Sequence, residues 1–147
     1  MLAIAGDGLQ LADPRAGLVR ALAFGMEWQD ALAALAFRGM PRTGRMEECG
    51  AGPLTYAKWD DGFTLYGQNG AFMGWFADTR AAGKLATAGG IGPGSTRAQL
   101  DGAYAAEVFE STLGTEFLAG DIGGLLDGTG PQARVTALWA GVSCNFR

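Results

Sequence analysis

The sequence predicts an α+β fold, with two helix-plus-antiparallel-meander repeats preceded by a short hairpin. Two observations predict it. The 25 glycines of the 147 residues recur in turn contexts such as "DDG", "QNG" and "DGTGP", which indicates many short strands joined by tight turns. Two stretches with apolar residues at helical spacing each precede a set of strand-like runs. A chain of this length with 48% hydrophobic residues fits one compact domain, residues 1–147.

The first element, within residues 1–22, is expected to be a hairpin. The short apolar runs "GLQLA" and "GLVRAL" flank the segment "DPRAG". Pro14 suits the first corner of a turn and Gly17 suits its exit. We therefore expect two short paired strands ahead of the repeats.

Repeat one is expected to cover residues 23–79. Apolar spacing predicts a helix from Glu27 to Arg38, and Pro41 forbids its continuation. The strand-like runs "LTYAKW", "FTLYGQ" and "AFMGWFAD" follow. They are separated by Asp61-Gly62 and Asn69-Gly70, which favour the two-residue turns of antiparallel hairpins. The result is a three-stranded meander.

Repeat two is expected to cover residues 90–147. Thr96 with Gln99 three positions later makes a capping-box pattern, so a second helix begins there. The runs "TEFLA", "DIGGLLD" and "ARVTALWAG" then predict a second meander. Because both halves follow one plan of glycine start, helix, link and three strands, the sequence predicts an internal duplication.

The turns also predict which residues share a face of the first meander. A two-residue turn pairs its flanking residues, so we expect Asp60 opposite Phe63 and Gln68 opposite Ala71. Alternation then gives a core face of Leu54, Tyr56, Phe63, Leu65, Phe72 and Phe76, and an opposite face of Thr55, Ala57, Trp59, Thr64, Tyr66, Gln68, Met73 and Trp75. The opposite face mixes polar groups with large rings, which is unlike an ordinary solvated surface.

The expected binding residues are Trp59, Tyr66, Met73 and Trp75, together with Arg134 and Thr136 on the equivalent face of the second repeat. Tyr, Trp and Met are enriched where proteins bind other proteins, because they offer large rigid area. Arg134 could anchor a carboxylate. Two alternatives stay open: the amino-terminal hairpin or a symmetric partner covers the rings, or the rings stack on a sugar or small ligand.

The residue types exclude several chemistries. The chain has no histidine, which removes Ser-His-Asp and Cys-His catalysis and His-ligated zinc. Its two cysteines cannot form a four-thiolate zinc site. We therefore predict no catalytic residue, metal or cofactor. An enzyme using carboxylates would need two of them to converge across a cleft, with Asp60 and Asp61 at a turn and Asp121 and Asp127 flanking a strand as the candidates.

The net charge and the hydropathy of the chain limit the classes of partner to expect. The formal net charge is −4 without a basic cluster, so nucleic acid is not an expected partner. No stretch approaches the roughly 20 apolar residues of a transmembrane segment. The opening "MLAIAGDGLQ" lacks the features of a signal peptide, and a chain trimmed after its signal would look the same.

The helix starts "AFGMEWQDAL" and "GIGPGSTRAQL", with a meander after each, resemble the β-lactamase-inhibitor-protein fold and its single-repeat relative, the outer-membrane-assembly lipoprotein BamE. The resemblance implies a periplasmic or secreted module that binds another protein with its sheet surface. The inhibitors typically carry a disulfide inside each repeat, whereas this chain has one cysteine per repeat. A bond from Cys49 to Cys144 would tie the halves together, and two free thiols are the alternative.

The leading prediction is thus an extracytoplasmic, non-enzymatic protein-binding or inhibitor-like module that uses an aromatic sheet face. The alternative is a carboxylate-dependent enzyme or binding protein for a glycan or other polar small molecule. A third hypothesis is a homodimer in which that face is self-complementary.

Overall fold

The computed structural model describes residues 2–13, 15 and 17–144. Within them the chain is mostly antiparallel β-structure, with an eight-stranded sheet in the order β4-β5-β6-β7-β11-β10-β9-β8 and a three-stranded sheet in the order β1-β2-β3. The predicted α+β fold with two helix-plus-meander repeats is therefore wrong. The sequence overestimates the helices and misses strands in the segments taken for links.

The large sheet is built from two four-stranded meanders that meet at its centre. The first contains β4 (Arg42–Met46), β5 (Leu54–Lys58), β6 (Phe63–Gln68) and β7 (Ala71–Asp78). The second contains β8 (Glu107–Ser111), β9 (Gly114–Ala119), β10 (Ile122–Leu126) and β11 (Val135–Gly141). Strands β7 and β11 pair antiparallel and join the two meanders. Both outer strands, β4 and β8, lie in segments expected to be links.

The helices are short. The α-helices α1 (Trp28–Ala34) and α2 (Arg97–Ala103) have seven residues each, and the 3-10 turns η1 (Ala36–Arg38) and η2 (Thr79–Ala81) complete the helical segments of the described chain. The helix predicted from Glu27 to Arg38 ends at Ala34, and a 3-10 turn follows. Helix α2 begins with the predicted capping box of Thr96 and Gln99, whereas α1 has no side-chain cap.

The expected internal duplication is not supported.

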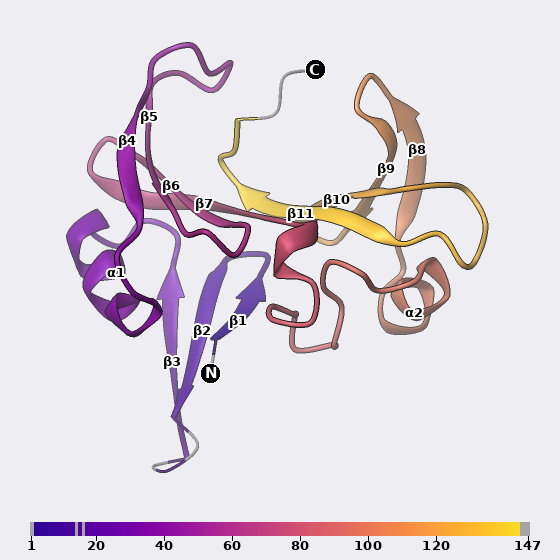
Figure 1. Ribbon diagram of the computed structural model, residues 1–147, viewed down its shortest axis with the longest axis horizontal. Coiled ribbons are helices and arrows are strands. Elements are labelled where there is room, and N and C mark those ends of the chain that lie inside the picture. Colours follow the sequence, from indigo (N-terminus) through magenta and orange to yellow (C-terminus); the bar gives the residue numbers. More distant parts are fainter. Residues whose placement is uncertain (1, 14, 16, 145–147) are drawn as a thin grey trace.

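The amino-terminal segment forms three strands, not a two-stranded hairpin. Strands β1 (Leu2–Ala5), β2 (Gly8–Asp13) and β3 (Leu18–Ala23) pair antiparallel in sequence order. Pro14, expected at a turn corner, lies outside the described residues. The β2–β3 hairpin projects away from the rest of the protein (Figure 1).

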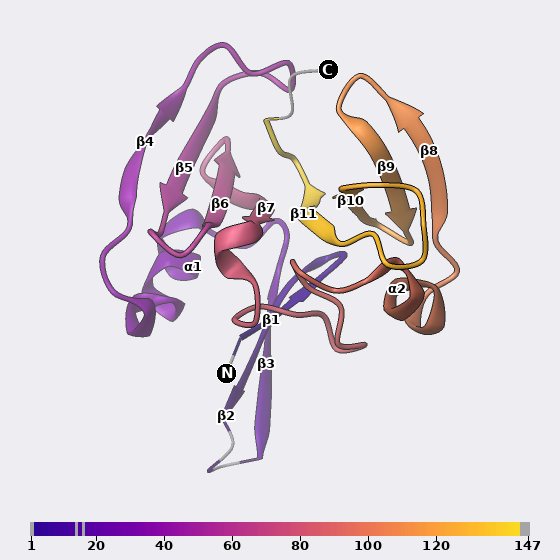
Figure 2. The same cartoon turned by 45° about the vertical axis from the view of Figure 1, so that its right-hand side comes forward.

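The large sheet is strongly curved. In Figures 1 and 2, both helices and the three-stranded sheet lie against its convex side, while β4 and β8 rise at its two edges with the segment that follows β11, as far as residue 144, between them. The core is on the convex side, where one row of paired residues contains Ala57, Leu65, Trp75, Ala140, Ile122 and Ala119. All six are buried in one hydrophobic cluster. We call the convex side the covered face and the concave side the open face.

No helix within the described part of the chain combines the length and hydropathy needed to span a bilayer.

Candidate binding face

The β5–β6 connection decides which rings reach the open face. The Trp59 N–H donates to the carbonyl oxygen of Phe63 at 3.0 Å, so the loop consists of Asp60, Asp61 and Gly62. Gly62 has φ 85°, which suits a three-residue hairpin loop that ends in a left-handed residue. The expected pairing of Asp60 with Phe63 is wrong by one residue. Because side chains alternate along a strand, this slip moves every β5 side chain to the other face relative to β6.

The β6–β7 connection is the predicted two-residue turn. Gln68 pairs with Ala71, and Asn69 and Gly70 have φ values of 54° and 81°, as the favoured hairpin turn requires. The register shifts after the pair of Gly67 with Phe72: the next residue of β7, Met73, has no partner on β6 and forms a β-bulge. The bulge places Phe72 and Trp75 on the same face, although strict alternation puts them on opposite faces.

Two of the predicted binding residues are buried in the covered face. Trp75 is 0% exposed, and its indole N–H donates to the carbonyl oxygen of Ala5 at 2.9 Å. The amino-terminal sheet therefore covers it. Trp59 is 6% exposed; its ring stacks on Phe63 at 5.7 Å, and its indole N–H donates to Gly39. The prediction that these two rings form an exposed surface is wrong.

Tyr66 and Met73 are not free surface residues either. Tyr66 lies on the open face, but it is 6% exposed because it packs in a second hydrophobic cluster with Cys49 and Leu54. The Met73 carbonyl accepts a hydrogen bond from the Val142 N–H at 2.9 Å, and its side chain is half-buried. The segment Val142–Cys144 thus covers the end of the open face where Tyr66 lies.

Arg134, directly before β11, and Thr136, within β11, form hydrogen bonds with other residues of the chain. The Arg134 guanidinium donates to the carbonyl oxygen of Gly94 at 2.6 Å, and its backbone N–H donates to the Asp127 carboxylate at 2.7 Å. The Thr136 hydroxyl donates to the carbonyl oxygen of Leu125 at 3.4 Å. The six predicted residues therefore do not form one site.

The open face carries a row of side chains across all eight strands. Directly paired residues share a face, and the strand registers link Arg42, Lys58, Thr64, Phe76, Trp139, Gly123, Leu118 and Glu107 in that order. We call these eight residues the transverse row. It runs from two cations at β4 and β5, over rings and an aliphatic side chain, to a carboxylate at β8.

The rings of the transverse row lie flat on the sheet. Phe76 and Trp139 stack at 6.2 Å with 7° between their planes. A Cβ atom at Gly123 would meet the Trp139 indole, and one at Gly44 would meet the Tyr56 ring. Glycine within a strand is thus required where a neighbouring ring crosses it. Sequence reasoning placed Phe76 and Tyr56 on the core face; glycines inside strands were the signal that rings cross the open face instead.

Two contacts hold charged side chains in place near the rings of the open face. The Lys58 ammonium lies 4.9 Å from the centre of the Tyr56 ring, a cation–π distance. Asp78 accepts hydrogen bonds from Arg80, the shorter two at 2.9 Å. Burial acts to raise the pKa of Asp78, but the Arg80 hydrogen bonds and charge outweigh it and lower that pKa. Asp78 is therefore an ion-pair carboxylate.

The carboxylates considered for catalysis have structural partners or lie apart from the transverse row. Asp61 pairs with Arg38, and Asp127 accepts the Arg134 N–H. Asp121 lines a hollow against β1. On the open face, the buried Glu116 accepts a hydrogen bond from the Ser111 hydroxyl at 2.8 Å. Among the described residues, no group of three or more Asp, Glu, Cys or His could hold a metal ion.

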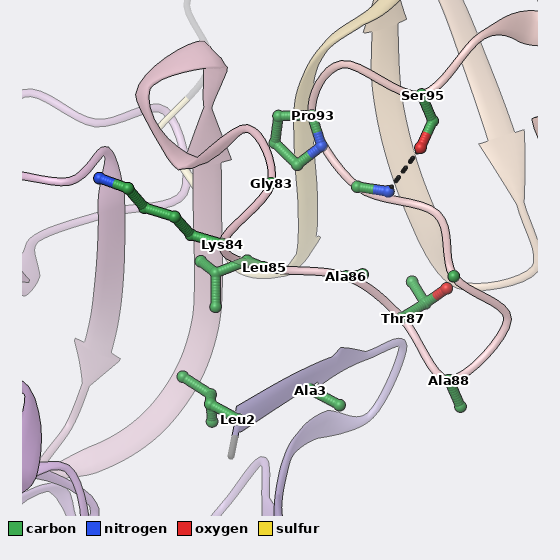
Figure 3. A pocket seen from close by; sticks show the side chains of 12 residues that line it. Leu2, Ala3, Gly83, Lys84, Leu85, Ala86, Thr87, Ala88, Pro93 and Ser95 are labelled. Atoms are coloured by element: carbon green, nitrogen blue, oxygen red, sulfur yellow. Dashed lines mark hydrogen bonds between the residues drawn. The ribbon is translucent and has the colours of Figure 1, made fainter.

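A hollow of about 500 Å³ lies away from the open face, between β1 and the segment 83–95. Figure 3 shows the Leu2 and Leu85 side chains pointing toward one another and the Lys84 side chain extending away from them. Of the described residues that line it, only Lys84 is charged. The Ser95 hydroxyl accepts the Gly92 N–H. A ligand site needs convergent polar groups, so this hollow is a weaker candidate than the open face.

At the end of the open face that the segment Val142–Cys144 covers, the Tyr66 phenol lies near the Cys49 and Cys144 thiols. Cys49 and Cys144 are free thiols, and Cys49 is buried. Burial, with smaller contributions from Cys144 and Cys49, raises the pKa of Tyr66 to about 12. Burial, with a hydrogen bond to Cys49, raises the pKa of Cys144 to about 11. The Tyr66 phenol and the Cys144 thiol are therefore neutral at pH 7.

These raised pKa values predict alkaline destabilisation. In the unfolded chain the Cys144 thiol ionises near pH 9 and the Tyr66 phenol near pH 10, below their folded values of about 11 and about 12. The unfolded state then binds fewer protons, so the contribution of these two groups to the free energy of unfolding is fully present below about pH 9 and is lost as pH rises to 12. We expect Tyr66→Phe to make this fall shallower above pH 10 in urea denaturation series. Tyr56→Phe, which removes a phenol from the same face, is the control, and equal effects of both changes would contradict the assignment.

Comparison of the chain with protein-family models, with curated proteins and with solved structures finds no match. The resemblance to the inhibitor fold thus stays a prediction, and the functional argument rests on the open face.

Proposed function

We propose that this protein is a binding module whose open face receives an extended segment of another protein. The observation that carries the proposal is the one-sided arrangement of the layers: both helices and the three-stranded sheet lie on the covered face (Figure 2). On the open face, the described chain adds only the segment Val142–Cys144 and the β4–β5 connection, which pack at one end. That cover packs against Phe76 of the transverse row, and the row extends beyond it to Leu118 and Glu107.

The composition of the transverse row favours a peptide. Its middle contains the exposed Leu118 side chain, at 42%, and the half-buried Phe76 ring, which stacks on Trp139; Trp139 itself is only 7% exposed and supports Phe76 from within the sheet. Rings and aliphatic side chains bind apolar residues by removing area from water. Its ends carry opposite charges, with Arg42 and Lys58 at one end and Glu107 at the other. Opposite charges at the two ends favour one orientation of a bound chain.

The dimensions also suit a peptide. Neighbouring strands are about 4.8 Å apart, so a row across eight strands spans roughly 34 Å before curvature is considered. An extended chain rises about 3.3 Å per residue, so about ten residues cover that distance. The resemblance to the inhibitor fold supports the same conclusion and an extracytoplasmic location.

The test uses a displayed library of random twelve-residue peptides selected against the immobilised full chain. Enriched peptides are then synthesised and titrated by fluorescence polarisation. We expect Leu118→Asp and Lys58→Glu to weaken binding about tenfold or more, the usual effect of losing an interface anchor. The proposal also predicts enriched peptides with an acidic end, an apolar middle and a basic end.

Two matched variants serve as controls. Val19→Asp changes an aliphatic side chain that is 66% exposed on β3. Lys84→Glu reverses the charge at the hollow between β1 and the segment 83–95. Both should leave affinity within about twofold. Peptides sensitive only to Lys84→Glu or Val19→Asp would contradict the assignment to the open face. Absence of peptide binding, with retention on a glycan array, would favour the small-molecule alternative, and a stable dimer lost on Leu118→Asp would favour self-association.

A further inference from the structure

The two cysteines of the chain lie together although they are 95 positions apart in the sequence. Cys49 lies in the β4–β5 connection, and Cys144 lies three residues beyond the end of β11. The Cys49 thiol donates to the carbonyl oxygen of Ser143 at 3.8 Å. Both cysteines contact the cluster of Leu54 and Tyr66 on the open face. The fold therefore brings one thiol from each meander to a common position.

The backbone holds both segments in place without help from the sulfur atoms. The Val142 N–H donates to the Met73 carbonyl at 2.9 Å, and the Val142 carbonyl occupies the space that a Cβ atom at Gly74 would need. On the other side, the Cys49 carbonyl accepts the Gly52 N–H at 2.9 Å within a turn. The backbone of the fold therefore places the two cysteines close together.

We propose that Cys49 and Cys144 form a disulfide bond that fastens the carboxyl-terminal end of β11 to the β4–β5 connection. Cys144 is the accessible partner, since it is half-buried whereas Cys49 is buried. The Cys49 Sγ atom already lies 3.8 Å from the carbonyl oxygen of Ser143, the residue directly before Cys144, so a small rearrangement brings the two sulfur atoms to the S–S distance of about 2.05 Å. This inference does not depend on the proposed function, because it holds whether or not the open face binds a peptide.

The oxidant is a low-molecular-weight disulfide such as oxidised glutathione. The Cys144 thiolate attacks one sulfur of that disulfide, a mixed disulfide forms, and one glutathione thiolate leaves. The Cys49 thiolate then attacks the Cys144 sulfur and releases the second glutathione. Two protein thiols are oxidised, one glutathione disulfide is reduced to two thiols, and the two protons released by the cysteines pass to the departing thiolates.

The expected consequence is a cross-link that encloses every strand from β5 to β11. A bond that closes a loop of this length restricts the unfolded chain strongly. We expect the midpoint of thermal unfolding to rise by on the order of 5–10 °C on oxidation. The reaction should be slow at pH 7 and faster at pH 9, because the thiolate is the reactive form.

The test incubates the reduced full chain with oxidised glutathione, then alkylates the remaining thiols with iodoacetamide in denaturant. Intact mass should show the loss of two hydrogens and no alkylation. Tryptic digestion should join the peptides of residues 46–58 and 135–147, which contain the two cysteines. Thermal unfolding with and without reductant measures the shift in midpoint.

Single-cysteine variants provide the matched controls. Cys49→Ser should accumulate one glutathione on Cys144 and show no thermal shift with reductant. Cys144→Ser should react more slowly than Cys49→Ser, because its remaining thiol is buried. The proposal is overturned if the oxidised wild type carries two glutathiones, keeps two thiols open to alkylation, or cross-links between chains. A bond that forms without raising the midpoint would overturn the claim that it fastens β11.

Discussion

Replacing Trp75 with alanine is expected to lower the free energy of unfolding by about 3–5 kcal/mol, the range for large aromatic side chains in a core. Trp75 is wholly buried at the middle of the covered face, paired with Leu65 and Ala140. The substitution leaves a cavity between the two sheets. It also leaves the Ala5 carbonyl without the indole N–H that it accepts, and an unpaired buried acceptor adds to the cost.

Equilibrium denaturation in urea at pH 7 measures this effect, with the slope checked for two-state behaviour. Trp75→Phe is the matched variant: it keeps an aromatic ring but removes the N–H donor, so we expect a loss of about 1–3 kcal/mol. Limited trypsin digestion should also cut the alanine variant sooner at Arg20, because the three-stranded sheet loses its anchor. An alanine variant as stable as the wild type would show that the amino-terminal sheet does not depend on this contact.

Replacing Gly74 with alanine is expected to lower the free energy of unfolding by about 2–3 kcal/mol. The added methyl group would overlap the Val142 carbonyl, which is backbone and cannot move aside as a flexible side chain can. Overpacking of this kind typically costs about 1–3 kcal/mol. The displaced carboxyl-terminal segment should also carry Cys144 away from Cys49, so formation of the proposed disulfide should slow about tenfold or more.

The control is Gly102→Ala. Gly102 lies in α2, and a Cβ atom there meets nothing within 4 Å. Alanine is the better helix former by about 0.5–1 kcal/mol, so this change should raise stability. Opposite signs for the two Gly→Ala changes in urea denaturation would support the contact at Gly74. A Gly74→Ala protein with wild-type stability would contradict it.

The sequence predicted the local features that depend on a few adjacent residues. The capping box of Thr96 and Gln99 is confirmed in both directions. The two-residue turn at Asn69-Gly70 is confirmed because Asn tolerates positive φ; Asn69 is the one non-glycine residue of the described chain that adopts it. Asp61 does not adopt it, and its carboxylate pairs with Arg38. The Asp61-Gly62 turn therefore became a three-residue loop.

The one extra residue in the β5–β6 loop accounts for much of the error in the predicted site. Face assignments propagate along a strand with period two, so one slip at the turn moved Tyr56 off the core face. The bulge at Met73 then reversed the assignment of Trp75. Neither event has a clear local signal, because a bulge is fixed by packing on both faces of the sheet.

The outer strands escaped prediction for a different reason. β4 reads "RTGRM" and β8 reads "EVFES", and neither has the strict alternation of a half-buried strand. Edge strands carry charges that discourage pairing with other chains, so their pattern resembles that of a loop. Their pairing partners, and not their own residues, make them strands.

The seam between β7 and β11 has a consequence for the protein during its synthesis. Phe76 pairs with Trp139, 63 positions later, whereas neighbouring strands of the first meander are joined by short local connections. The first meander can therefore assemble while the ribosome is still adding residues, but β7 has no partner on one side until residues 135–141 have emerged. An unpaired strand edge is a site of aggregation. In the nascent chain that exposed edge is the future centre of the sheet.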